Sequence, residues 1–341
     1  MRIIIMRKGF YQLLFVATCF LNISFGVLGI GINYGLLGDN LPPAAQVVGL
    51  LRSRGVSKIR IFDPNSDVLK ALGNTGISVI VGTRNEDLES LSKDPSYATK
   101  WVKEHIAPYA SSTKIAYVSA GNEVIPGPLA DYVLNAMQNL YAALVGANLN
   151  IPVTTAVAMN MLGNSYPPSA GVFSDDSIVF MTPISTFLSQ QGTPLLVNVY
   201  PYFAYVGNRD TVPLSYALLQ HNAPPVIDGS LQYDNLFHSM VDAVYSALDK
   251  VGASGVEVIV SETGWPSSGD QDATYGNAQT YNNNVIALES SRKGTPKRPG
   301  KAVQTYIFAL FNENMKPAGT EQNFGLYHPD MTEVYHVNIP A

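Results

Sequence analysis

The sequence is poor in cysteine, histidine and charged side chains, and each shortage excludes a class of protein. Its 341 residues contain one cysteine, Cys19, and five histidines. A disulfide framework is therefore excluded, and no histidine stands at a spacing typical of a metal site. Charged residues make up 14% of the chain against 46% hydrophobic residues. This balance excludes a disordered chain and leaves ample material for one large core.

Two further patterns are missing. Gly29, Gly31 and Gly35 superficially resemble the glycine fingerprint of dinucleotide-binding proteins, but the third glycine comes one residue late. Pro42 and Pro43 follow where a helix should begin. We therefore expect no cofactor and no metal. After residue 26 the chain also lacks any Asn-x-Ser/Thr acceptor, so N-glycosylation is not expected.

The N-terminus has the pattern of a secretory signal peptide. Arg2, Arg7 and Lys8 precede an apolar run over residues 10–21, which is too short to span a bilayer. Small residues at Ser24 and Gly26 mark a cleavage site after Gly26. A buried helix of the mature fold is the alternative interpretation of the same run. We expect residues 1–26 to be removed and residues 27–341 to form one secreted domain.

The remaining chain is acidic. Loss of residues 1–26 removes three basic and no acidic groups, which leaves 18 basic and 26 acidic residues and a net charge near −8. An acidic surface argues against nucleic acid or an anionic membrane as the partner. The sequence ends at Ala341 without a lipid-anchor signal or an added binding module, so we expect a monomer that has no membrane anchor.

Apolar, β-branched runs alternate along the chain with longer helical patterns, which is typical of parallel strands covered by helices. Eight runs are candidate strands: Ile30–Asn33, Lys58–Phe62, Ser78–Gly82, Ile115–Ser119, Val153–Ala158, Leu195–Val199, Val256–Val260 and Thr305–Leu310. Between them lie candidate helices at Ala44–Arg54, Ala130–Val145 and Leu236–Val251. Eight such units without a break in composition predict an α/β fold, a single (β/α)₈ TIM barrel. Residues 200–233 exceed an ordinary connection, and we expect an elaborated loop region there, at the mouth of the barrel.

Functional groups of such barrels lie at the C-terminal ends of the strands. Glu123 follows the fourth candidate strand and Glu262 follows the seventh, each beside glycine and aromatic residues. Cleavage of a glycosidic bond needs two carboxyl groups, one protonated and one ionised. The pair therefore suggests this chemistry, and the sequence does not show which carboxyl is protonated. A surface salt bridge is the alternative for each glutamate alone.

Other side chains at the same strand ends are candidates for contact with sugar. Asn122 and Asn198 are placed to donate to hydroxyls, and aromatic rings can stack on pyranose faces or pack beneath the loops. The aromatic candidates are Tyr34, Tyr200, Phe203, Phe324 and Trp265. For Trp265 we favour packing beneath the turn after Glu262. Arg60 and Asp63 are expected to form an internal ion pair.

Several motifs together resemble glycoside hydrolase family 17, the plant endo-1,3-β-glucanases. The most specific is the run over residues 256–267, which includes Ser261-Glu262-Thr263-Gly264-Trp265-Pro266. The other matching segments are Gly121-Asn122-Glu123-Val124, residues 30–35, 58–63, 197–203 and 308–313. The resemblance extends from about Gly29 to Asn338. It departs at Asn33, where many members have cysteine, a change expected to affect strand packing only.

The resemblance implies a retaining, double-displacement reaction on β-glucan such as callose or fungal wall polymer. Glu262 would be the nucleophile, and Glu123 the acid and then the base. Glu313, Lys316 and Glu321 would form a charged network at the end of the eighth strand, with a surface cluster as the alternative. The implied location is the extracellular space or cell wall, or a vacuole, with roles such as defence.

Three other functions remain open. The same site could act on mixed 1,3-1,4-β-glucan, because the family contains both activities. It could also transfer the glycosyl group to another sugar instead of water. A non-catalytic glucan-binding protein is disfavoured, because both carboxylates are present.

Overall fold

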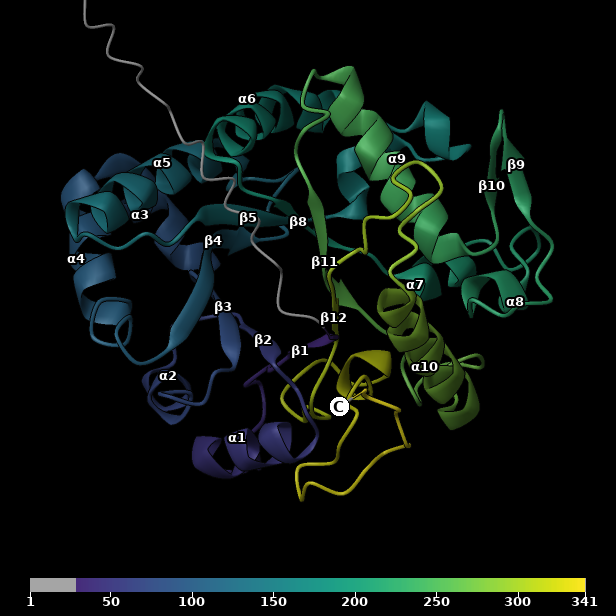
Figure 1. Ribbon diagram of the computed structural model, residues 1–341, viewed down its shortest axis with the longest axis horizontal. Coiled ribbons are helices and arrows are strands. Elements are labelled where there is room, and N and C mark those ends of the chain that lie inside the picture. The colour runs from purple at the N-terminus through teal and green to yellow at the C-terminus, as the bar shows by residue number, and fades with distance from the viewer. Residues whose placement is uncertain (1–28, 341) are drawn as a thin grey trace, which may run out of the picture.

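The computed structural model describes residues 29–340, and the predicted leader 1–26 lies outside the described residues. Eight parallel strands close into a barrel, with helices around it (Figure 1). In barrel order the strands are β1 (Gly31–Asn33), β2 (Lys58–Ile61), β3 (Ser78–Gly82), β4 (Lys114–Asn122), β5 (Val153–Ala158), β8 (Leu195–Asn198), β11 (Val258–Thr263) and β12 (Thr305–Ile307). The predicted TIM barrel is confirmed, and all eight candidate strands belong to it.

Helices cover the outside of the barrel. They are α1 (Ala44–Ser53), α2 (Ser66–Ala71), α3 (Leu88–Lys93), α4 (Pro95–His105), α5 (Ala130–Gly146), α6 (Asp175–Gln191), α9 (Leu236–Lys250) and α10 (Tyr275–Ser291). The three helices predicted from the sequence agree with α1, α5 and α9 to within one residue at each end. Side-chain caps fix several starts: Asn65 accepts from two amides of α2, and Thr274 accepts from an amide of α10.

The eighth unit differs from the expected pattern. Among the described residues, β12 is followed only by a short 3-10 turn, η4 (Thr320–Gln322), and by irregular chain. That chain packs where an eighth helix would lie. Arg54 at the end of α1 contacts Glu333 at 2.8 Å, and Asn282 of α10 donates to the Tyr335 hydroxyl at 2.7 Å. These side-chain contacts to α1 and α10 thus close the ring of helices at the position where an eighth helix would lie.

The inside of the barrel is filled by side chains from alternate strand positions. Ile80, Leu196, Ile259 and Tyr306 form a buried cluster there. Gly31 is required opposite the tyrosine, because a Cβ atom at residue 31 would lie 2.3 Å from the Tyr306 ring. The lower barrel is therefore a packed core, and the cleft described below lies above it, at the C-terminal ends of the strands.

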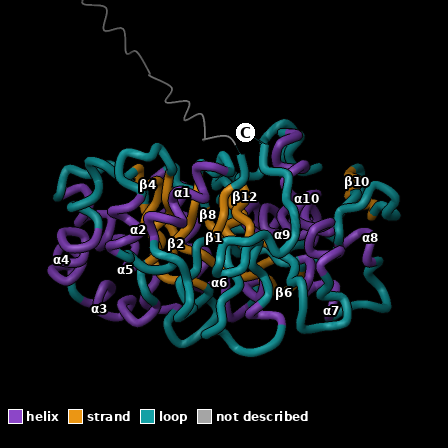
Figure 2. The backbone as a smooth tube through the Cα atoms, turned by 90° about the horizontal axis from the view of Figure 1, so that it is seen from below, coloured by secondary structure: helices purple, strands orange, loops and turns teal. Residues whose placement is uncertain are grey.

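The long connection after β8 forms α7 (Pro201–Val206), α8 (Leu214–Ala217) and a hairpin of β9 (Val226–Asp228) and β10 (Leu231–Tyr233). Figure 2 shows the hairpin at the periphery, away from the central strands. Only the first part of this connection reaches the mouth of the barrel, where Phe203 and Ala204 line the cleft. A second hairpin, β6 (Leu162–Asn164) with β7 (Val172–Phe173), lies between β5 and α6 and was not predicted.

Candidate active site

A cleft of about 1020 Å³ lies at the C-terminal ends of the strands. The ends of all eight barrel strands, or the loops after them, contribute lining residues, from Leu37 after β1 to Lys316 after β12. Glu123 and Glu262 both line it, so the structure brings the two predicted carboxylates together. Both predicted glutamates thus lie on the face formed by the C-terminal ends of the strands.

Glu262 lies inside β11 and not after it, because the strand runs three residues further than predicted. Its register against β8 shifts between Val260 and Glu262. Such an irregularity breaks strict alternation, so consecutive residues can turn to the same side. Here Ser261 donates to Asn198 Oδ1 at 2.7 Å, while Glu262 Oε1 accepts from Asn198 Nδ2 at 2.8 Å. Both residues are buried, Glu262 with 6% of its surface exposed.

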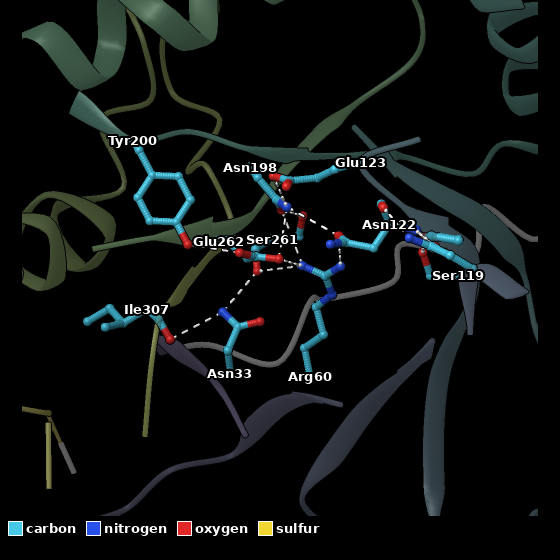
Figure 3. Close-up of polar contacts among 12 residues, drawn as sticks. Asn33, Arg60, Ser119, Asn122, Glu123, Asn198, Tyr200, Ser261, Glu262 and Ile307 are labelled. Atoms are coloured by element: carbon cyan, nitrogen blue, oxygen red, sulfur yellow. Dashed lines mark hydrogen bonds and ion pairs between the residues drawn. The ribbon is translucent and has the colours of Figure 1, made fainter. Parts of the chain in front are cut away.

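Arg60 provides the positive charge beside Glu262. Its Nη1 lies 2.7 Å from Glu262 Oε1, and its Nη2 donates to Asn122 Oδ1 at 2.7 Å (Figure 3). The expected ion pair between Arg60 and Asp63 is wrong: Asp63 lies 3.8 Å from Arg84 at the rim instead. Alternation along β2 explains this, because Arg60 points into the barrel. The sequence placed Arg60 at a strand end but gave no sign of its partner.

The environment of Glu262 has opposing electrostatic effects. Burial raises the pKa of its carboxyl above the ordinary value, and the nearby Glu123 adds to this. Arg60, the hydrogen bond from the Tyr200 hydroxyl to Oε2 at 2.8 Å, and Lys316 all act to lower that pKa. The site therefore collects three groups that favour the ionised form against the burial that opposes it.

Glu123 directly follows β4 in an unusual backbone conformation. Its φ of 55° and the φ of 73° at Gly121 lie in the left-handed region. Asn198 Nδ2 donates to Glu123 Oε1 at 2.8 Å, the same distance at which it donates to Glu262. One amide nitrogen thus lies between the two carboxylates, and the facing oxygens can be separated by at most twice that distance.

The structure pairs two members of the predicted charged network. Lys316 Nζ lies 3.4 Å from Glu313 Oε2 and 4.0 Å from the centre of the Phe308 ring. Glu313 is 2% exposed and accepts the Leu37 amide at 2.7 Å, so it also ties the loop after β1 to the loop after β12. Glu321 lines the same cleft half-buried. The buried pair rules out a purely surface cluster.

Aromatic rings form one wall of the cleft. Tyr200, Phe308 and Phe324 contact one another edge to face, with ring centres 5.6–6.2 Å apart. Phe203 packs against Tyr200 and is 46% exposed, so it presents the most open ring of the set. Phe308 belongs to this wall but was not among the predicted site residues, although the motif that contains it was noted.

Three aromatic candidates for substrate contact are buried. Phe324, within the aromatic wall, is 2% exposed, so its ring offers no open face to a sugar. Trp265 is fully buried, packs against Tyr202 and Tyr281, and donates to the Asp272 carbonyl at 2.9 Å. With no part of its ring exposed, Trp265 cannot stack on a sugar, and it packs beneath the turn after Glu262 as the sequence favoured. Tyr34 reaches the cleft wall but is 2% exposed, with its ring edge-on to Phe311. Stacking of Tyr34 on sugar is therefore also corrected.

Asn33 has the packing role expected for it. Its Nδ2 donates to the carbonyls of Ser261 at 3.0 Å and Ile307 at 3.2 Å, which joins β1 to β11 and β12 (Figure 3). Within residues 29–340, no group of three or more His, Cys, Asp or Glu side chains is placed to hold a metal ion. In the same part of the chain, no helix is long and apolar enough to cross a membrane.

Several known proteins are similar to this chain in sequence and in fold. Residues 30–339 match the model of the glycosyl hydrolases family 17. The GVI protein of Hordeum vulgare is 51% identical, over 93% of this chain and 98% of that protein. The glucan endo-1,3-beta-glucosidase of Vitis vinifera is 46% identical, over 93% of each chain. The structure of CJP38, a beta-1,3-glucanase and pollen allergen of Cryptomeria japonica, aligns with a TM-score of 0.88 and 48% identity, over 91% of this chain and 98% of that one.

Proposed function

Because the chain belongs to glycosyl hydrolase family 17 and is a glycoside hydrolase, we propose that it hydrolyses internal 1,3-β-glucosidic linkages of β-glucan with retention of configuration. The names of its relatives supply the linkage. The main structural support for this proposal is the Asn198 amide, which donates at 2.8 Å to both Glu123 and Glu262.

That shared amide bears on stereochemistry. Retaining glycosidases have carboxyl groups roughly 5–5.5 Å apart, whereas inverting enzymes leave roughly 6.5–9.5 Å for a water molecule. Two oxygens that contact one nitrogen at 2.8 Å each fit the shorter spacing. The geometry therefore supports direct attack by one carboxylate on the anomeric carbon.

Glu262 has the nucleophile's role in this proposal. Its carboxylate attacks the anomeric carbon while the glycosidic bond breaks, and a glycosyl ester forms. Arg60 and the Tyr200 hydroxyl hold the two oxygens in place and favour their ionised form. Asn122 and Asn198, which touch these groups, are the candidates for contact with hydroxyls of the bound sugar.

Glu123 has the role of acid and then base. It gives its proton to the leaving glycosidic oxygen, and in the second step it removes a proton from the water that cleaves the ester. Its side chain faces the cleft next to Asn198 and makes no ion pair within residues 29–340. A carboxyl without a cationic partner suits proton donation better than the Arg60-bound Glu262 does.

The cleft suits a long neutral polymer. Residues from the ends of β1 to β12 line it, and the proposed internal cleavage requires that a glucan chain lie across it without presenting an end. The exposed Phe203 ring offers an apolar face for a pyranose, and Lys316, Glu313 and Glu321 line the same cleft.

The nucleophile is tested by Glu262→Gln, which keeps the shape but cannot form the ester. We expect release of reducing ends from laminarin to fall by about 10⁴-fold or more, with binding to the polymer retained. Glu257→Gln is the matched control: Glu257 lies just before β11, its side chain is 69% exposed, and its loss should leave activity unchanged. Full activity in Glu262→Gln would refute the assignment.

The substrate and outcome are tested together on the wild-type protein. Laminarin should be cleaved faster than mixed 1,3-1,4-β-glucan, and the first product should be the β-anomer by NMR. Activity confined to the mixed polymer would contradict the proposed linkage. Products longer than the substrate would show glycosyl transfer instead of hydrolysis.

Residues 27–341 are proposed to be the catalytic domain, a monomer that is exported after loss of residues 1–26. The basic and apolar pattern of the leader supports export. Expression of the full chain in a secretory host should release a protein that begins at Val27. An N-terminal sequence that retains Met1, or a retention volume of a dimer, would contradict these points.

A further inference from the structure

The backbone that leads from β4 to Glu123 departs from regular strand pairing. The register of β4 against β5 shifts between Ser119 and Asn122, and Gly121 has left-handed φ. Gly121 also has no room for a side chain, since a Cβ there would lie 2.8 Å from Leu88 Cδ1. Such backbone persists only where surrounding groups hold it.

Side chains from the loop after β3 replace the missing ladder bonds. The Gly121 amide donates to Thr83 Oγ1 at 3.0 Å. The Asn122 amide then donates to Asn85 Oδ1 at 2.8 Å, and Asn85 Nδ2 donates to the Asn122 carbonyl at 3.0 Å. One asparagine side chain therefore binds both polar groups of the residue before Glu123, as a paired strand would.

On its other side the same segment is fixed by β5. The Glu123 amide donates to the Ala156 carbonyl at 2.9 Å. Asn85 and Ala156 thus hold the two residues 122 and 123 from opposite sides. Without Asn85, residue 122 would lose both of these backbone contacts, and the turn would keep the contacts of Thr83 with Gly121 and of Ala156 with Glu123.

We propose that Asn85 is a positioning residue for Glu123, which keeps the acid carboxyl at the distance that proton transfer requires. The proposal rests on the proposed role of Glu123. Asn85 itself makes no bond to either carboxylate among the described residues, and acts through the Asn122 backbone. Because Asn85 lines the cleft half-buried, direct contact with substrate is the competing role.

Leaving groups of graded acidity distinguish these roles. In a dinitrophenyl laminaribioside the leaving group is an acidic phenol, which departs without being protonated. A sugar leaving group must instead be protonated by the acid. For Asn85→Ala we expect kcat/KM on laminarin to fall about 10–100-fold, since a misplacement near 1 Å has this effect. On the dinitrophenyl glycoside it should stay within about threefold of wild type, with KM for laminarin little changed.

Two further variants complete the experiment. Asn85→Asp keeps the acceptor for the Asn122 amide but loses the donor, so it should lie between wild type and Asn85→Ala. Asn139→Ala is the matched control, because Asn139 also donates to backbone carbonyls, those of Leu91 and Ser92, and none of these three residues lines the cleft. It should lower thermal stability without any dependence on the leaving group.

Glu123→Gln separates failure of the inference from failure of the proposed function. It should show the same leaving-group dependence as Asn85→Ala, but more strongly. If Glu123→Gln shows none, the role of Glu123 is wrong. If Glu123→Gln behaves as expected but Asn85→Ala loses activity equally on all leaving groups, or changes only KM, the positioning role is overturned. The same selective defect in Asn139→Ala would also overturn it.

Discussion

Two buried cations lie two residues apart on β2, and they have different surroundings. Arg60, at the mouth of the barrel, is 1% exposed and bonds to Glu262, Asn198 and Asn122 at 2.7–3.2 Å. Lys58, deeper in the barrel, is 2% exposed, with its Nζ 3.8 Å from Glu289 and 5.9 Å from the centre of the Tyr306 ring. Both side chains point into the barrel, because alternate strand residues share a face.

The ion pairs Arg60–Glu262 and Lys58–Glu289 differ in how completely polar contacts replace the water that the charged groups lose on burial. Burial lowers the pKa of Lys58 to about 8, and burial also raises the pKa of Glu289, so neither charge is fully compensated by the other. At the mouth, hydrogen bonds to two asparagine side chains supplement the ion pair. A planar guanidinium can serve several acceptors at once, whereas an ammonium acts as a point charge. We infer that Arg60 serves the reaction and that Lys58 does not.

Among these variants, Arg60→Met should cause the largest loss of activity. Removal of one partner of a buried pair costs roughly 3–5 kcal/mol of stability. Because the nucleophile also loses the cation that favours its ionised form, we expect kcat/KM to fall by roughly 10²–10³-fold. The pKa of Glu262 should rise further, and because the nucleophile must be ionised, the acid limb of the pH–rate profile should move to higher pH. Arg60→Lys keeps the charge and should lose less. A profile unchanged in Arg60→Met would refute the electrostatic role.

Tyr200→Phe tests a smaller part of the same network. It removes the 2.8 Å hydrogen bond to Glu262 Oε2 but keeps the ring. A hydrogen bond to a charged group contributes roughly 1.5–3 kcal/mol to stability. Because this bond also favours the ionised form of the nucleophile, we expect kcat to fall about 10–100-fold, with the acid limb again moved to higher pH. Tyr202→Phe is the control, because its hydroxyl donates to Asp270 instead. A change confined to KM would instead favour a hydrogen bond from the Tyr200 hydroxyl to the bound sugar.

The double variant Lys58→Met, Glu289→Gln should have the smallest effect on activity, within about twofold. Replacement of a buried pair by groups of similar size is often stabilising by roughly 1–4 kcal/mol, and we expect a gain near the lower end at about pH 7 by urea unfolding. A loss of activity comparable to that of Arg60→Met would end the distinction between the two cations.

The pH dependence of that gain has a definite sign. The folded-state pKa of Lys58, about 8, lies below its ordinary value of 10.5. The stability from this depressed pKa is present above 10.5 and is lost as pH falls through 8. As pH rises from about 8 to 10.5, the free energy of unfolding of the wild type should therefore increase relative to that of the double variant. A constant difference across this range would show that Lys58 does not titrate as described.

The sequence predicted some residues of the site and missed others for identifiable reasons. Glu123 and Glu262 were found because strand ends can be read from apolar runs. The end of β11 was placed too early, because polar residues such as Ser261 conceal a strand that continues with an irregular register. Arg60 was assigned to Asp63, its neighbour in sequence, because the sequence does not show which side chains meet across a barrel.

Aromatic residues show the same limit. Tyr34 and Tyr200 both follow strands and had the same expected role, yet one packs against Phe311 and the other bonds to Glu262. Asn85 had no signal at all, since an asparagine after a strand is an ordinary turn residue. Its contact with Asn122 depends on how closely the ends of β3 and β4 approach.

The sequence by itself determined the barrel, its eight strands and the face that carries the two glutamates. Apolar runs and strand order suffice for this, because burial of those runs allows few arrangements. Only the tertiary structure decided how the charges are paired: Arg60 with Glu262, and Asn198 between the two carboxylates. These contacts join residues between 64 and 202 positions apart, and their geometry depends on the closure and stagger of the barrel, which local patterns do not encode.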